Sequence, residues 1–259
     1  MNEKKSTYFP GYNISNQKQK ASKFEKLKTV YKKEGLASLI KKIYTYITYK
    51  ISYAIFKINY TILNRFFILD GKKYHYFINI DNSVKSERVV EIPFAKEFLL
   101  RYRGKNILEI GNVLSHYFSF NHGIVDKYEI SPGVINIDII DFSPEKKYDL
   151  IISVSTIEHI GFDEPHKDKG KPKKALLKIF DLLNSNGTAI ITVPLGYNPE
   201  IDSILVNNEI SFTKKYFLKR VSILNLWKET TMEEALKYKY GQKYPAANSV
   251  AFLILYKEQ

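Results

Sequence analysis

Two different patterns of apolar positions divide the chain. In the first third, isoleucines recur at steps of three or four residues, at positions Ile40, Ile43, Ile47, Ile51, Ile55, Ile58 and Ile62. At ~100° per residue they fall within a stripe roughly 120° wide, which predicts an amphipathic helix. We expect this helix to run from about Lys23 to about Asn64, with a break at Gly35. The opposite face carries lysine and tyrosine: Lys42, Tyr46, Tyr49, Lys50, Tyr53, Lys57 and Tyr60.

From Asn79 onward, short apolar runs separated by turn residues alternate with helical patches. The runs predict strands near Asn106–Ile110, Gly123–Lys127, Val134–Ile137, Asp149–Ser153, Thr188–Val193, Val221–Leu226 and Ser249–Tyr256. The patches predict helices near Glu91–Tyr102, Lys173–Leu183 and Thr213–Lys219. Continuous apolar strands alternating with helices indicate a parallel sheet covered on both faces. Ligands of such sheets bind beyond the carboxyl ends of the strands, so the loops there should carry the chemistry.

Composition narrows the class of protein. The 259 residues include no cysteine, which excludes a disulfide-stapled scaffold, a thiolate nucleophile and a cysteine-ligated metal centre. A reducing, cytoplasmic setting is therefore expected. No uncharged apolar run reaches the ~18–20 residues of a membrane span. The first apolar stretch comes late and is broken by lysines, which is unlike a signal peptide.

The charge is concentrated at one end of the chain. Residues 1–75 carry 16 Lys and Arg against four Asp and Glu, whereas the rest carries 24 against 23. We therefore expect a mobile basic tail over 1–22, a basic helical extension over 23–75 and a nearly neutral globular domain over 76–259. An acidic partner would bind the N-terminal third.

The isoleucine stripe has two interpretations. It packs on the globular domain or a second copy of the chain, or it lies in the acyl boundary of a membrane with lysines against anionic head groups. A peripheral membrane or protein partner through residues 23–70 is therefore expected. RNA ranks third for this segment, because arginine is nearly absent from it.

The predicted strand ends carry polar residues suited to a nucleoside. The first strand ends in the sequence ILEIGN, where Gly111 permits a tight turn beside a ligand. The pattern GxGxxG is absent, which disfavours a nicotinamide or flavin dinucleotide. Asp126 ends the second strand, where a carboxylate accepts from a ribose diol. Asp138 follows the third strand, where it can accept from an adenine amino group.

The series ILEIG, IVD, NIDI, YDLIISVSTIEHI and LLNSNGTAIITVP, in this order and spacing, resembles the class I S-adenosylmethionine-dependent methyltransferases over about residues 88–256. The resemblance implies a Rossmann-like α/β fold with a seven-stranded, mostly parallel sheet whose last two strands form an antiparallel pair. It also implies S-adenosyl-L-methionine as the methyl donor. VVEIP, GNVLSHY, VDKYE and PGVINIDI are similar to a bacterial and archaeal subgroup suspected of modifying surface glycans. We therefore expect O-methylation of a small-molecule or glycan-type acceptor.

The resemblance also assigns binding roles to individual positions. Glu109 and Gly111, with Asn112 beside them, would line the methionine end of the donor. Asp126 would bind the ribose hydroxyls, and Asp138 and Ile139 the adenine. After the fourth strand, Ser153 and Ser155 would approach the methionine moiety.

A hydroxyl acceptor benefits from a general base near the methyl group, and histidine suits neutral pH. His159, His116 and His122 are the candidates, with His122 ranked last because it precedes a strand. Glu158 would hold the tautomer of His159 or bind an amine of the donor. Tyr197 and Asn198 follow the fifth strand and would contact the acceptor. A divalent ion on Glu158, His159, Asp163 and His166 is the alternative for this region. The charged run around it favours a surface loop, so we expect no metal.

Two other functions remain open on the sequence. A donor-binding protein without turnover is favoured by the single glycine of the first loop and opposed by Asp126 and Asp138. An RNA methyltransferase is disfavoured by the neutral charge balance of residues 76–259, because phosphate contacts need basic residues. We therefore expect no nucleic-acid partner.

Overall fold

The computed structural model describes residues 23–79, 85–119 and 121–258. The tail expected over 1–22 lies outside the described residues. The chain divides into two compact units, one of residues 1–54 with 119–121 and one of residues 55–118 with 122–259. Within the described ranges, no helix is both long enough and apolar enough to cross a membrane.

In the described part of the first unit, residues 23–54 are helical, as the isoleucine spacing predicts. Helix α1 spans Lys23–Lys57, and the backbone of Gly35 leaves the helical conformation at φ 81° and ψ 176°. This confirms the expected break. A π-helical turn, η1 (Ile58–Ile62), continues the helix into the second unit.

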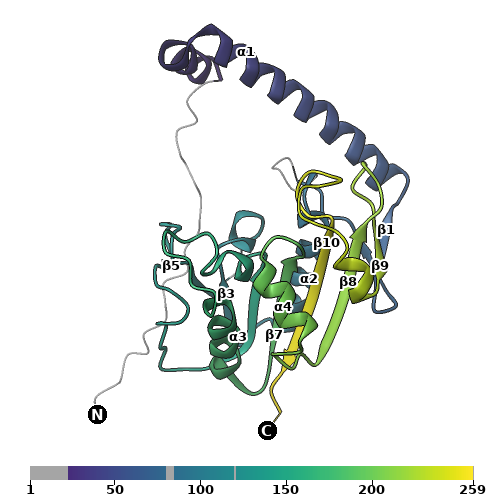
Figure 1. Cartoon of the computed structure of the whole chain (residues 1–259). Helices are drawn as coiled ribbons and strands as arrows, with labels where there is room; N and C mark the ends of the chain where they lie inside the picture. Colours follow the sequence, from purple (N-terminus) through teal and green to yellow (C-terminus); the bar gives the residue numbers. More distant parts are fainter. Residues whose placement is uncertain (1–22, 80–84, 120, 259) are drawn as a thin grey trace. The chain divides into compact units, whose positions relative to one another are not determined.

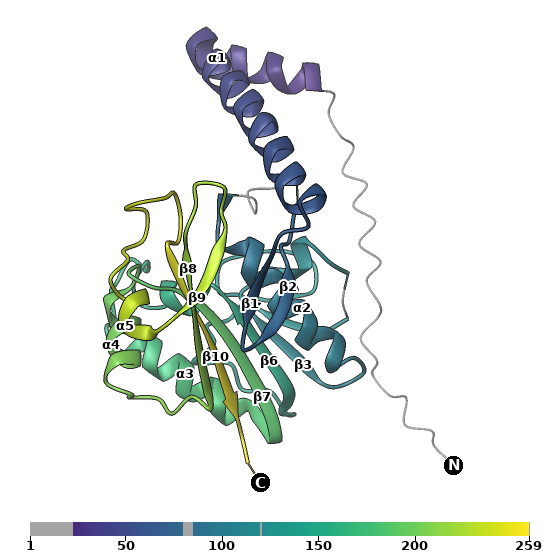
Figure 2. The same cartoon turned by 90° about the vertical axis from the view of Figure 1, so that its right-hand side faces the viewer.

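The second unit is built on an eight-stranded sheet (Figures 1 and 2). Its strands are β3 (Ile107–Ile110), β4 (Gly123–Val125), β5 (Val134–Ile135), β6 (Tyr148–Val154), β7 (Leu183–Pro194), β8 (Lys214–Arg220), β9 (Trp227–Thr230) and β10 (Ser249–Tyr256). They lie in the order β5-β4-β3-β6-β7-β10-β8-β9. The first five are parallel, and β10 inserts antiparallel between β7 and β8. The expected Rossmann-like sheet with an antiparallel pair is confirmed, and β9 adds an eighth strand.

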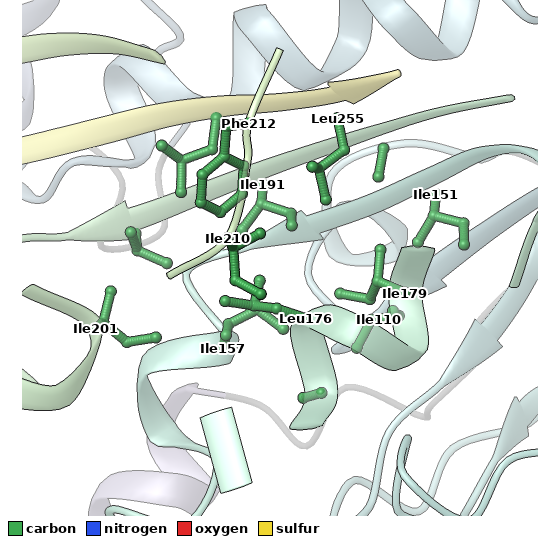
Figure 3. Close-up of a cluster of buried hydrophobic side chains, with 14 of the residues drawn as sticks. Ile110, Ile151, Ile157, Leu176, Ile179, Ile191, Ile201, Ile210, Phe212 and Leu255 are labelled. Carbon is green, nitrogen blue, oxygen red and sulfur yellow. The ribbon is translucent and has the colours of Figure 1, made fainter. Parts of the chain in front are cut away.

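Helices cover both faces of this sheet. On one face, α3 (Lys171–Leu182) and α4 (Pro199–Val206) pack on the apolar side chains of the central strands. Figure 3 shows part of this cluster, with Ile151 and Ile191 of the strands near Leu176 and Ile179 of α3. On the other face lies α2 (Arg88–Arg101), whose Phe94 ring is 5.0 Å from that of Phe252 in β10. A short helix, α5 (Met232–Ala235), follows β9.

A second, two-stranded sheet precedes this domain. Strands β1 (Phe66–Leu69) and β2 (Lys72–His75) form an antiparallel hairpin. The hairpin contacts the β9 end of the large sheet, where the amide of Asp70 donates to Glu229 at 3.1 Å. The hydroxyl of Tyr60 in η1 donates to the Leu224 carbonyl at 2.8 Å. Residues 55–75, placed in the extension on the sequence, thus pack with the domain.

Two predicted elements near the end of the chain are wrong. Residues 213–219, expected as a helix, contain most of strand β8, and residues 221–226, expected as a strand, form a loop. The loop folds around the guanidinium of Arg220, which is only 3% exposed. This group donates to the carbonyls of Ser222 and Ile223 at 3.1 and 3.3 Å, and to those of Lys85 and Pro245. The apolar segment VSILNL therefore lies in a loop around a buried guanidinium, and it does not form a strand of the sheet.

Candidate functional site

A cavity of about 670 Å³ opens at the carboxyl ends of β3, β4, β5 and β6. This is the edge of the sheet where ligands of open parallel sheets bind. Its walls combine apolar side chains with carboxylates. The apolar side chains are Ile110, Val113, Val125, Ile137, Ile139 and Ile160, and the carboxylates are Asp126, Glu129, Asp138, Asp163 and Glu164. Gly111, Asn112, Ser155 and His159 complete the set of expected site residues that line it.

The turn after β3 is built around a buried carboxylate. Glu109 is fully buried and accepts from the backbone amides of Val113 and Leu114 at 2.8 and 2.6 Å. Its second oxygen lies 2.6 Å from Nε2 of His122. Glu109 therefore shapes the loop and does not line the cavity, although its role toward the donor was expected to be direct. Its assignment as a donor ligand stays a prediction.

Gly111 allows this turn to pack against the loop after β6. Its φ is +82°, a left-handed value, and a Cβ there would lie 2.1 Å from Oγ1 of Thr156. Any larger residue would therefore be strained in conformation and would also clash. The glycine is needed for the close approach of two loops that both line the cavity.

Asp126 closes the same turn from β4. Its Oδ2 accepts from the amide of Asn112 at 3.0 Å, and its Oδ1 accepts from the amides of Tyr128 and Glu129, each at 2.8 Å. Partial burial raises the pKa of Asp126, but these three hydrogen bonds outweigh it and lower that pKa overall. A carboxylate has about four acceptor sites, so an ionised Asp126 keeps one for a ligand hydroxyl.

Glu129 is a cavity residue that the sequence reading did not assign. Its Oε1 accepts from the Asn112 amide group at 2.6 Å and from Ser131 at 3.1 Å. Its Oε2 lies 3.2 Å from Nε2 of His116, which is half exposed and does not line the cavity. The signal was present in the sequence, because VDKYE places a second acid one turn beyond the strand end.

At the far side of the cavity, Asp138 belongs to a four-membered ionic cluster. Its Oδ2 lies 3.0 Å from Nζ of Lys127 and 2.7 Å from Nζ of Lys171. Glu164 contacts the same two amines at 3.0 and 2.6 Å. Burial raises the pKa of Asp138, but the bonds from Lys171 and Lys127 lower it overall. The cluster attaches the 161–170 loop to the strand ends. Oδ1 of Asp138 accepts from the amide of Ile140 at 3.2 Å.

His159 is the histidine that the fold brings to the cavity. It ends the 3₁₀ turn η4 (Ile157–His159), and its side chain is 48% exposed. Nδ1 of His159 contacts Oδ2 of Asp163, and the hydroxyl of Tyr197 donates to the same carboxylate at 2.6 Å. Because a carboxylate only accepts, Nδ1 donates in this contact, so Nε2 is the nitrogen that can receive a proton when the ring is neutral. Asp163 therefore orients the ring, a role that the sequence reading gave to Glu158.

The remaining expected residues lie behind the cavity wall. Ser153 is buried, and its hydroxyl donates to the Ile110 carbonyl at 3.3 Å. Asn198 is 2% exposed; it caps α4 through the amide of Glu200 at 3.0 Å and donates to the Glu158 carbonyl at 2.8 Å. Their roles toward ligands stay predictions. Across the described part of the chain, no three His, Cys, Asp or Glu side chains form a group that could hold a metal.

The chain is similar to solved structures in its fold, whereas its sequence has no match among curated proteins. No protein-family model matches the chain, and no curated protein sequence matches it. The N-methyltransferase NodS from Bradyrhizobium japonicum WM9, solved with S-adenosyl-L-homocysteine, is similar with a TM-score of 0.41 at 13% identity, covering 67% of this chain and 92% of its own. The 1,6-didemethyltoxoflavin-N1-methyltransferase of Burkholderia thailandensis gives a TM-score of 0.40 at 14% identity, covering 66% and 79%. The plantazolicin methyltransferase BpumL gives 0.35 at 14%, covering 64% and 81%.

Proposed function

We propose that the protein is an S-adenosylmethionine-dependent methyltransferase that acts on oxygen of a small-molecule or glycan-type acceptor. The observation that carries the proposal is the cavity itself, with Asp126 and Glu129 after β4, Asp138 after the adjacent parallel strand β5, and isoleucines in the same walls. Apolar walls suit a nucleobase, and carboxylates accept from ribose hydroxyls and amino groups. The strand order places this cavity where open parallel sheets bind nucleosides.

The residues present fit this donor. Ile137 and Ile139 would contact the adenine, and Oδ1 of Asp138 would accept from its amino group. Asp126, with one acceptor site left, and Glu129 would bind the ribose. Ser155 and the turn at Gly111 would face the methionine end.

His159 would supply the chemistry that a hydroxyl acceptor needs. When bound, the donor supplies a methyl group on a sulfonium, whose C–S bond breaks as the C–O bond to the acceptor forms. His159 takes the hydroxyl proton on Nε2, and Asp163 stabilises the imidazolium that results. Alignment of donor and acceptor in the cavity would supply much of the remaining rate acceleration, because an in-line displacement requires the two reacting atoms to be held in one geometry.

Calorimetric titration with S-adenosylmethionine and S-adenosylhomocysteine tests the proposal. We expect micromolar binding by the intact protein and at least tenfold weaker binding by Ile137→Trp, which fills the cavity from its wall. Asp126→Asn should also weaken binding, because the NH2 group that replaces one carboxylate oxygen cannot accept from the backbone amides that it faces. Glu209→Gln, which changes surface contacts with Lys173 and Asn207, is the control. Absence of binding of either compound to the intact protein would refute the donor site.

We further propose that α1 and η1 bind the surface of an anionic membrane. The stripe isoleucines are 38–72% exposed, and Lys32, Lys41 and Lys50 are also exposed. Exposed aliphatic side chains bordered by lysines suit a bilayer interface carrying anionic lipids. Flotation of the full chain with phosphatidylserine vesicles should recover the intact protein, and the double variant Ile47→Glu, Ile51→Glu should remain unbound. Tyr46→Glu is the control off the stripe. Equal recovery of the double variant, or a stable dimer without vesicle binding, would refute this.

A further inference from the structure

Three buried glutamates meet behind the cavity wall. Glu87 and Glu91 lie at the start of α2, and Glu158 lies in η4, with exposures of 6%, 0% and 0%. Arg88 donates to Glu91 at 2.6 Å, so one of the three carboxylates has a cationic partner. The amide of Ala247 donates to Glu87 at 3.1 Å. Glu91 raises the pKa of Glu87, and Glu91 and Glu87 both raise that of Glu158, because like charges repel at close range.

Glu158 is the member of this group whose partner is most distant, since Nε2 of His159 lies 3.6 Å from its Oε1. Within the described ranges, neither of its carboxylate oxygens has a hydrogen-bond partner. Burial raises the pKa of Glu158 well above its usual value, and Glu91 adds to this, against smaller lowering effects of its own backbone amide and of Arg88; the shift favours the protonated carboxyl. A buried carboxyl without a hydrogen bond is costly, and it is therefore suited to a ligand that supplies a positive charge.

The group touches the cavity through two residues of its wall. The hydroxyl of Ser155, which lines the cavity, donates to Glu91 at 2.6 Å. Nε2 of His159, which also lines it, lies 3.6 Å from Oε1 of Glu158. Glu158 and Glu91 thus lie one side chain behind the point where an acceptor hydroxyl would meet the base.

Aromatic rings stand beside the same point. The Tyr197 ring is 4.9 Å from the His159 ring and 4.9 Å from the Tyr240 ring. Burial, and then the fields of Glu87 and Glu158, raise the pKa of Tyr240 to about 12. Tyrosine rings next to carboxylates form a favourable environment for an ammonium group, through cation–π attraction and ion pairing.

We propose that the acceptor carries a protonated amine close to its hydroxyl, and that Glu158, from directly behind the wall, supplies the negative charge that stabilises this ammonium while His159 receives the hydroxyl. The proposal rests on the methyltransferase function proposed above and specifies its substrate class as amino alcohols and amino sugars. On binding, Glu158 releases its proton to solvent and the ammonium takes its place as the compensating charge. A neutral glycan would leave Glu158 without this partner.

Binding of matched amines and amides to the full chain, saturated with S-adenosylhomocysteine, tests the proposal. The probes are methyl 2-amino-2-deoxyglucoside, ethanolamine and 1-amino-2-propanol, each paired with its N-acetyl form, and titrated by calorimetry at pH 7. We expect at least one free amine to bind at least tenfold more tightly than its N-acetyl form. Glu158→Gln should abolish this preference without changing S-adenosylhomocysteine affinity, and Glu209→Gln should retain it.

Proton release supplies a second readout that a structural role would not produce. Titration in two buffers of different ionisation enthalpy should show release of protons on amine binding to the intact protein and a smaller release for Glu158→Gln. Equal binding of amine and N-acetyl probes, absence of binding of all probes to the complex, or an unchanged preference in Glu158→Gln would overturn the proposal. Loss of S-adenosylhomocysteine binding by the intact protein would instead refute the proposed function.

Discussion

Replacement of Gly111 by alanine should destabilise the protein through two separable effects. The first is conformational, because φ is +82° and an L-residue there costs about 1–2 kcal/mol. The second is steric. The new Cβ would lie 2.1 Å from Oγ1, 2.7 Å from Cγ2 and 2.9 Å from Cβ of Thr156. Rotation of Thr156 about χ1 moves the first two atoms but leaves its Cβ in place, so the backbone must shift.

Gly133→Ala separates the two effects. Gly133 has nearly the same φ, +83°, and no atom lies within 4 Å of the position of its Cβ. We expect this variant to lose about 1–2 kcal/mol of unfolding free energy from conformation alone. Gly111→Ala should lose that amount and roughly 1–3 kcal/mol more from overpacking, a total of about 2–5 kcal/mol.

Urea unfolding followed by circular dichroism measures both variants against the parent. Combination of Gly111→Ala with Thr156→Gly should recover the steric part, so the two substitutions should be strongly coupled in a double-mutant cycle. Calorimetry on the same proteins should show weaker S-adenosylmethionine binding only for the Gly111 variant. Equal destabilisation by Gly111→Ala and Gly133→Ala would refute the claim that the turn after β3 must pack on Thr156.

Three further substitutions test other parts of the site. Glu158→Gln should raise the melting temperature more at pH values above the usual pKa of a glutamic acid than below it. The unfolded carboxyl ionises there while the raised pKa of the folded one opposes ionisation, so the parent loses at most about 1.4 kcal/mol of stability per pH unit; an equal gain at all pH values would contradict this. Glu109→Ala leaves two loop amides without their acceptor and should cost about 3 kcal/mol in urea unfolding, with a cost below about 1 kcal/mol contradicting its role. Glu164→Ala removes the contacts that attach the 161–170 loop to Lys127 and Lys171, so amide hydrogen exchange should accelerate in that loop and remain unchanged in β6.

The sheet could be predicted from the sequence because its strands are apolar on both faces. The runs at Asn106–Ile110, Asp149–Ser153 and Ser249–Tyr256 each coincide with an observed strand, within a few residues at the ends. Strand β8 could not be recognised, because KKYFLKR carries four basic residues and has the composition of an exposed helix. It is held in the sheet by pairing with β10, and tertiary pairing of this kind overrides local preference.

Most of the candidate site could also be placed from the sequence, but the partners of its carboxylates could not. Asp126 and Asp138 line the cavity, as expected of acids at strand ends. Three backbone amides already occupy Asp126, and two lysines occupy Asp138. One of those lysines, Lys171, lies 33 positions away along the chain, so no local pattern indicated it. A strand-end position determines where a carboxylate lies, whereas the loop geometry determines how much of its accepting capacity remains.

The same reasoning explains why Glu109 and Glu158 have different roles although both are fully buried. Glu109 receives two backbone amides and a histidine nitrogen, so its burial is compensated within the loop that it shapes. Glu158 accepts no such hydrogen bond from the described residues, since Nε2 of His159 is 3.6 Å from its Oε1, and burial raises its pKa well above the usual value. A loop-shaping acid keeps its role in the absence of any ligand. An uncompensated acid behind a cavity wall gains most from a cationic ligand, and the acceptor preference of this site should therefore depend on Glu158 and the donor affinity should not.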